Sequence, residues 1–141
     1  MKVFLDANVL TDIANETADA PRIHRRLEAV GVRSCALSAI TIEELHFGVL
    51  SGPSVKKAYQ IRNLKAMIAA FRRIDFTSDA ARAAAAVRLQ LKSVPQRRGK
   101  KRPGPLDLLL AGHAIAEHRT VVTADDGFNS LTGVRVENWR E

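Results

Sequence analysis

Four acidic side chains, spread over most of the chain, are placed where they could act together. They are Asp6, Glu44, Asp107 and Asp125. Carboxylates that lie within a few ångströms of one another repel and titrate abnormally unless a cation lies between them. Ligand sets made only of oxygen favour a hard ion, Mg²⁺ or Mn²⁺. Such an ion with open coordination positions can hold a phosphodiester oxygen and lower the pKa of a bound water, so we treat the four acids as candidate metal ligands and catalytic residues.

Two of the acids follow predicted strands. Asp6 ends the apolar run Val3-Phe4-Leu5, and Asp125 stands just beyond the strand predicted over 120–123. In parallel α/β sheets, ligand sites lie beyond the carboxyl ends of the strands. Both carboxylates are therefore expected at the same edge of a sheet.

The other two acids belong to predicted helices. Asp107 lies in the first turn of a helix expected over 106–117, and Glu44 lies early in a helix that Ser38 can cap and that extends to Leu50. Each acid also has a simpler interpretation. Asp107 could stabilise the helix dipole, Asp6 and Asp125 could cap the turns that follow them, and Glu44 could lie on a solvated helix face. Asp6 is the most distinctive, because a carboxylate at the end of a buried strand is costly without a partner.

The hydrophobic pattern alternates between strands and helices along the chain. Strands are predicted over 3–5, 32–37, 73–76, 120–123 and 134–136. Helices are predicted over 8–16, 21–30, 38–50, 54–72, 77–91 and 106–117. This alternation favours an α/β fold with a parallel sheet covered on both faces. With 141 residues and no internal repeat or linker, we expect a single domain over 1–141.

Composition restricts the setting in which the chain works. Lys and Arg number 22 and Asp and Glu 15, so the net charge of +7 favours a polyanionic partner. The single cysteine, Cys35, cannot form an internal disulfide and fits a reducing compartment. No apolar run approaches the roughly 20 residues of a membrane span, so we expect a soluble cytoplasmic protein with no membrane contact.

A basic loop precedes Asp107. Its five cations are Arg97, Arg98, Lys100, Lys101 and Arg102. They could hold a nucleic-acid backbone against a metal at the acids, and we predict RNA contact. The alternative is a solvated loop that serves solubility.

Four short motifs resemble those of PIN-domain proteins. Phe4-Leu5-Asp6-Ala7-Asn8-Val9-Leu10 looks like the opening of such a domain, and Thr41-Ile42-Glu43-Glu44-Leu45-His46-Phe47-Gly48 resembles the second motif. Gly104-Pro105-Leu106-Asp107-Leu108-Leu109-Leu110-Ala111 is similar to the third, and Thr123-Ala124-Asp125-Asp126-Gly127-Phe128 to the fourth. Their order, their spacing and the total length resemble VapC-type toxins of VapBC toxin–antitoxin pairs, over essentially the whole chain.

The resemblance implies a three-layer α/β/α sandwich with a five-stranded parallel sheet. It implies a Mg²⁺- or Mn²⁺-dependent endoribonuclease that forms a homodimer and is inhibited by a small VapB-like antitoxin. Carried over position by position, the acids are Asp6, Glu44, Asp107 and Asp125, and Asn8 and Thr123 are polar residues that support them. We prefer Asp125 over the adjacent Asp126 because of its register with Thr123. The number of metal ions and the RNA target stay open.

Two other classes of function compete with this interpretation. A phosphatase of the haloacid dehalogenase type also begins with a strand and an aspartate, but it needs a second aspartate where this chain has Asn8. A non-catalytic, PIN-like nucleic-acid-binding module is the second alternative, although all four acids are present. The four histidines show no metal-ligand spacing. Apart from His46, which could approach the edge of the site, they are expected at the surface.

Overall fold

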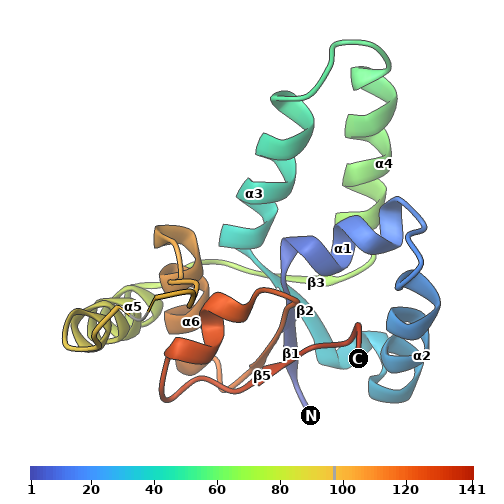
Figure 1. Ribbon diagram of the computed structural model, residues 1–141. Helices are drawn as coiled ribbons and strands as arrows, with labels where there is room; N and C mark the ends of the chain where they lie inside the picture. The colour runs from blue at the N-terminus through green and yellow to red at the C-terminus, as the bar shows by residue number, and fades with distance from the viewer. Residues whose placement is uncertain (97) are drawn as a thin grey trace.

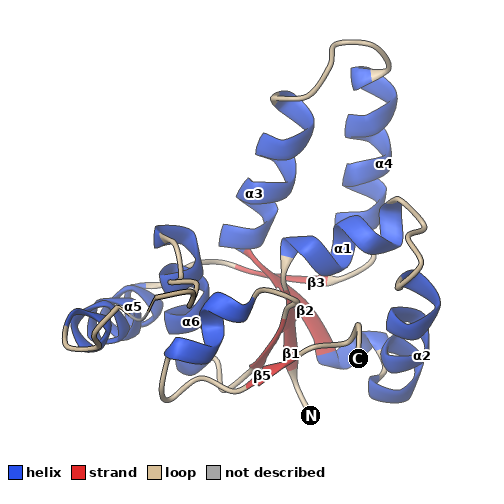
Figure 2. Ribbon diagram, in the orientation of Figure 1, coloured by secondary structure: helices blue, strands red, loops and turns tan. Residues whose placement is uncertain are grey.

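A five-stranded, fully parallel sheet forms the centre of the computed structural model, with strand order β3-β2-β1-β4-β5 (Figures 1 and 2). The structure describes residues 1–96 and 98–141. The strands are β1 (Val3–Leu5), β2 (Cys35–Ser38), β3 (Arg72–Ile74), β4 (Thr120–Val122) and β5 (Val136–Glu137). The first strand is therefore central, and its partners on either side are β2 and β4.

Helices cover both faces of the sheet. They are α1 (Ala7–Ala14), α2 (Ala20–Val30), α3 (Ala39–Leu50), α4 (Lys57–Ala69), α5 (Ser78–Lys92) and α6 (Pro105–Ala116), with a 3₁₀ helix, η2 (Asp126–Ser130), after β4. One apolar core joins the sheet to α1, α2 and α4, and the other joins it to α5, α6 and η2. Figure 1 shows α3 and α4 projecting together from this body. The predicted three-layer α/β/α sandwich is confirmed.

The predicted elements are all present, with shifts at their ends. The strand expected from residue 32 begins at Cys35, because Gly31 (φ 89°) leads into a short 3₁₀ turn over Val32–Ser34. The helix expected over 54–72 is shorter at both ends, Lys57–Ala69, since Lys56 adopts a left-handed conformation (φ 62°) and β3 starts at Arg72. None of the helices in the described ranges is long and apolar enough to cross a membrane.

Tight packing between α5 and α6 fixes the helix that carries Asp107. A Cβ atom at Gly112 would lie 2.3 Å from the Cα atom of Ala84, so only glycine allows this approach of the two backbones. Packing this close fixes the position of α6 relative to α5, and with it the position of Asp107 in the first turn of α6.

One expectation is wrong: His113 is not at the surface. Its side chain is completely buried in α6, where the ring packs against Phe4 and Phe76 with centroid separations of 4.8 and 5.3 Å. Its Nδ1 lies 2.8 Å from the hydroxyl of Ser38. Because that hydroxyl accepts from the amide of Ile40 at the start of α3, the histidine joins the α6 layer to the first turn of α3. The contact with Ser38 satisfies Nδ1 of the buried ring, whereas Nε2 is buried without a hydrogen-bond partner among the described residues.

Candidate active site

The four acids converge at the carboxyl edge of the sheet, where β1 meets β4. The chain leaves β1 toward β2 and β3 on one side and returns to β4 on the other, so this edge is the topological switch point at which α/β folds place ligands. The backbone closes this point directly, since the amide of Asp6 donates to the carbonyl of Val122 at 2.9 Å. The carboxylates of Asp6 and Asp125 therefore follow neighbouring strands, as the sequence predicts.

Asp6 is held by hydrogen bonds on both carboxylate oxygens. Oδ1 accepts from the amide of Ala7 at 2.8 Å, which caps α1. Oδ2 accepts from the hydroxyl of Thr123 at 2.8 Å and from the side-chain amide of Asn8 at 3.3 Å. Only 4% of the residue is exposed, so the buried carboxylate does have the partners that its position demands. The capping interpretation of Asp6 is therefore confirmed, while its role as a metal ligand stays a prediction.

Asn8 and Thr123 connect Asp6 to the loop that carries Asp125. Asn8 donates to the Thr123 hydroxyl at 3.0 Å and accepts from the amide of Ala124 at 3.1 Å. The same hydroxyl accepts from the amide of Asp125 at 3.0 Å. The two polar residues singled out in the sequence thus tie together the ends of β1 and β4.

Asp125 and Asp107 each make one bond to a nearby backbone amide. Asp125 Oδ1 accepts from Gly127 at 2.9 Å and caps η2, while Asp107 Oδ2 accepts from Gly104 at 2.9 Å at the start of α6. Asp125 is half-buried, whereas its neighbour Asp126 is exposed. This difference supports Asp125 as the fourth acid.

The charges of the four acids act on one another. Burial raises the pKa of Asp6, and the negative charges of Asp107 and Asp125 raise it further, against the opposing hydrogen bonds from Thr123 and Ala7. Burial and the charge of Asp125 also raise the pKa of Asp107. For Glu44, burial first, and then the charges of the other acids, raise the pKa from 4.5 to about 7. Mutual repulsion of this kind is what a bound cation relieves.

The donor set fits a hard divalent ion by its chemistry. All four side chains offer carboxylate oxygens, and each of three has a pKa raised in part by charges of the others. Within the described ranges, no three His, Cys, Asp or Glu side chains form a group that could hold an ion by themselves. Mg²⁺ suits such an open arrangement, because it keeps several waters and commonly uses only one or two carboxylates.

The members of the basic loop differ in their roles. The ammonium group of Lys101 lies 3.0 Å from Asp125 Oδ1, inside the acidic site. The guanidinium of Arg102 instead donates to the carbonyls of Leu91 and Val94, at 3.0 and 3.2 Å, at the end of α5. Arg98 and Lys100 are exposed, and Arg97 lies outside the described residues. The contact of Lys101 and the burial of His113 are the two features that sequence spacing did not single out.

Comparison with known proteins finds a family and a relative that match this chain over almost its whole length. The family model described as the PIN domain matches residues 3–134. Ribonuclease VapC2 of Rickettsia felis is 29% identical over 141 residues, with 99% of this chain and 98% of that protein covered.

Solved structures of toxin–antitoxin complexes superpose closely. The structure of VapBC2 from Rickettsia felis bound to a promoter DNA fragment matches with a TM-score of 0.81 at 27% identity, over 99% of each chain. DNA-bound VapBC from Salmonella typhimurium matches with a TM-score of 0.81 at 27% identity, over 99% of this chain and 98% of that one. Since the family model spans nearly all of the sequence and its four motifs meet at one edge of the sheet, this chain belongs to the PIN-domain family.

Proposed function

We propose that this chain is a metal-dependent endoribonuclease that acts as the toxin of a type II toxin–antitoxin pair. The observation that carries the proposal is the convergence of Asp6, Glu44, Asp107 and Asp125 at the switch point of a PIN-domain sheet. The relative named Ribonuclease VapC2 supports the activity, and the matched VapBC complexes support the pairing with an antitoxin.

Nucleases of this family generally depend on a divalent metal ion, and we assign Mg²⁺ or Mn²⁺ to this site. Asp6 and Asp107 would bind the ion directly, with Glu44 and Asp125 completing the ligands directly or through water. When bound, the ion would supply activation of a water and charge neutralisation at the phosphodiester. Thr123 and Asn8 hold the Asp6 carboxylate in one orientation, so that this ligand needs little reorganisation before metal binds.

The exposed cations beside the site suit an RNA backbone. Arg98 and Lys100 lie in the loop that leads to Asp107, and Lys101 reaches the acids themselves. We propose that these residues position the RNA, with the scissile phosphate at the acidic site. Arg102 would contribute mainly by fixing the loop to α5.

An antitoxin of the VapB type is the expected protein partner. Apolar side chains are exposed on the projecting α3–α4 hairpin, where Phe47 is 65% and Tyr59 is 59% exposed. Exposed apolar surface of this kind is typical of protein–protein contact, and the groove between α1, α3 and α4 includes Glu44. A partner seated there would reach the site. The homodimer remains a prediction, and a measurement of the mass of the isolated protein in solution tests it. We place the toxin and its antitoxin in the cytoplasm, where the RNA substrate is found.

The test combines RNA cleavage with metal binding. We expect Asp107→Asn and Asp6→Asn each to lower cleavage at saturating Mg²⁺ by about 10³-fold, roughly 4 kcal/mol of transition-state stabilisation. Asp126→Asn serves as a matched control with the same loss of charge on an exposed neighbour, and it should cleave at close to the wild-type rate. Millimolar Mn²⁺ should raise the Tm of the wild type by about 4 °C and leave Asp107→Asn unchanged.

The same experiment separates the alternative of a non-catalytic binding module. Such a module would bind RNA without metal-dependent cleavage. Mn²⁺ would then shift the Tm of the wild type and of Asp107→Asn equally. Full activity of Asp6→Asn would contradict the four-acid site.

A further inference from the structure

Lys101 lies in the acidic site although it belongs to the basic loop. Its ammonium nitrogen is 3.0 Å from Asp125 Oδ1, the oxygen that also accepts from the amide of Gly127 at 2.9 Å. Asp107 and Asp126 add further negative charge around it, and the contact with Asp125, by hydrogen bonding and then by charge, raises the pKa of Lys101. The ammonium group is therefore positively charged at neutral pH.

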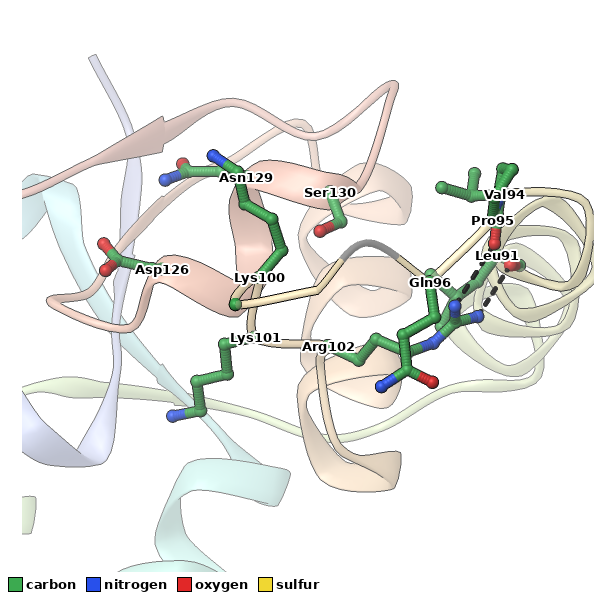
Figure 3. A pocket seen from close by; sticks show the side chains of 11 residues that line it. Leu91, Val94, Pro95, Gln96, Lys100, Lys101, Arg102, Asp126, Asn129 and Ser130 are labelled. Atoms are coloured by element: carbon green, nitrogen blue, oxygen red, sulfur yellow. Dashed lines mark hydrogen bonds between the residues drawn. The ribbon is translucent and has the colours of Figure 1, made fainter.

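The position of Lys101 is fixed by its neighbours on the chain. The next residue is Arg102, and Figure 3 shows its side chain pointing away from that of Lys101. The Arg102 guanidinium donates to the carbonyls of Leu91 and Val94. Pro103 is buried against Gly127, where a Cβ atom would lie 3.2 Å from the proline Cα and 3.1 Å from Asp125 Oδ1. Two consecutive anchors thus hold the backbone of Lys101 beside η2. The contact with Asp125 is consequently a property of this position and not of a freely moving basic loop.

This placement conflicts with metal binding at the same acid. A divalent ion that uses Asp125 must either displace the ammonium group or bind beside it, and both weaken the binding. The side chain of Lys101 is 63% exposed and that of Asp125 is 18% exposed, so the lysine can withdraw into solvent while the acid stays in place.

We propose that Lys101 is the resident counter-ion of the acidic site, which competes with the divalent metal for Asp125 and sets the metal concentration at which the site is loaded. This inference rests on the proposed metal site. It adds the tuning of metal affinity to the RNA contact proposed for Lys101, a second role that Arg98 and Lys100 would not share.

Binding of Mn²⁺ to the RNA-free protein, measured by isothermal titration calorimetry at pH 8, tests this role. We expect Lys101→Met to lower the Kd for Mn²⁺ by about 3- to 10-fold, since a positive charge next to the ion has been removed. Lys101→Arg keeps the charge and should stay within about 2-fold of the wild type. Lys100 is exposed and lines the same pocket as Lys101, the one drawn in Figure 3. Lys100→Met removes the same charge one residue away and should also change the Kd by less than about 2-fold.

The Asp125→Asn background supplies a second and independent measurement. There Lys101→Met should change the Kd for Mn²⁺ by less than about 2-fold, because the group for which the two cations compete is gone. An unchanged Kd in Lys101→Met, or an equal gain in Lys100→Met, overturns the counter-ion role. Those results leave the metal site intact if Asp107→Asn still abolishes binding, whereas a wild type that binds no Mn²⁺ overturns the site and the counter-ion together.

Discussion

The two halves of the acidic site differ in how firmly they are held. On the sheet side, the carboxylate of Asp6 is buried, and it accepts hydrogen bonds from Ala7, Thr123 and Asn8. On the hairpin side, Glu44 is only partly buried, and the causes that raise its pKa are burial and charge, with no hydrogen bond among them. One half is fixed before any ligand arrives, and the other is free to adjust.

This difference indicates a division of labour within one site. A fixed carboxylate reduces the reorganisation needed to bind a metal ion. An acid without fixed partners, on a projecting helix, can move toward an ion or toward a partner protein. When its charge is neutralised, its burial costs less and its repulsion with the other acids disappears. Substitutions in the two halves should therefore have opposite effects on stability.

The largest stability effect is expected in the fixed half, from Thr123→Val. The hydroxyl of Thr123 donates to Asp6 and accepts from both Asn8 and the amide of Asp125, so its removal leaves a buried carboxylate short of a partner. We expect the free energy of unfolding at pH 7, measured in urea, to fall by about 2 to 3 kcal/mol. Thr123→Ser keeps the hydroxyl and should recover most of the loss. Equal stability of the valine variant and the wild type would contradict a preformed network.

A smaller effect, of opposite sign, is expected in the free half from Glu44→Gln. The pKa of Glu44 in the folded chain is about 7, above its ordinary value of 4.5, so the folded state binds this proton more tightly than the unfolded state does. The associated stability is complete below pH 4.5 and is lost as the pH rises through 7. We expect Glu44→Gln to be more stable than the wild type by about 1 kcal/mol at pH 8 and no more stable at pH 4. Glu43→Gln, one position away and exposed, is the control.

The smallest effect on folding is expected in the basic loop, outside both halves. Replacing Arg98 and Lys100 with Gln should leave the Tm within about 1 °C of the wild type, because both side chains are exposed. The plot of log affinity against log salt for single-stranded RNA should lose about 0.7 in slope for each phosphate contact removed. Unchanged slopes would mean that these cations serve solubility and that the RNA approaches from another side.

The sequence predicts where Asp6 and Asp125 lie because each follows closely after a strand, whereas the roles of Asn8 and Thr123 came only from the resemblance to the PIN domain. An acid directly after a buried apolar strand requires partners, and parallel strands bring the residues that follow them to one edge. The alternation of strands and helices likewise predicts the three layers correctly. The ends of elements were less predictable, since Gly31 and Lys56 adopt positive φ angles that move the start of β2 and α4.

Features that depend on contacts across the fold could not be read from spacing. His113 has the same sequence signature as a surface histidine, and only the packing of α6 between Phe4, Phe76 and Ser38 buries it. Lys101 is one of five similar cations in the basic loop, and the anchoring of Arg102 and Pro103 places it beside Asp125. Both features arise from tertiary neighbours that a single sequence does not identify.

The strand order also has a consequence for the time at which this centre comes into being. Asp6 leaves the ribosome early, yet the hydroxyl that orients it belongs to Thr123, 117 residues later. At synthesis rates of about 5 to 20 residues per second, that interval lasts roughly 6 to 23 s. Throughout it β1 lacks its β4 neighbour, and the acids have no common edge on which to meet. A nascent chain therefore cannot assemble the acidic site until its translation is nearly finished.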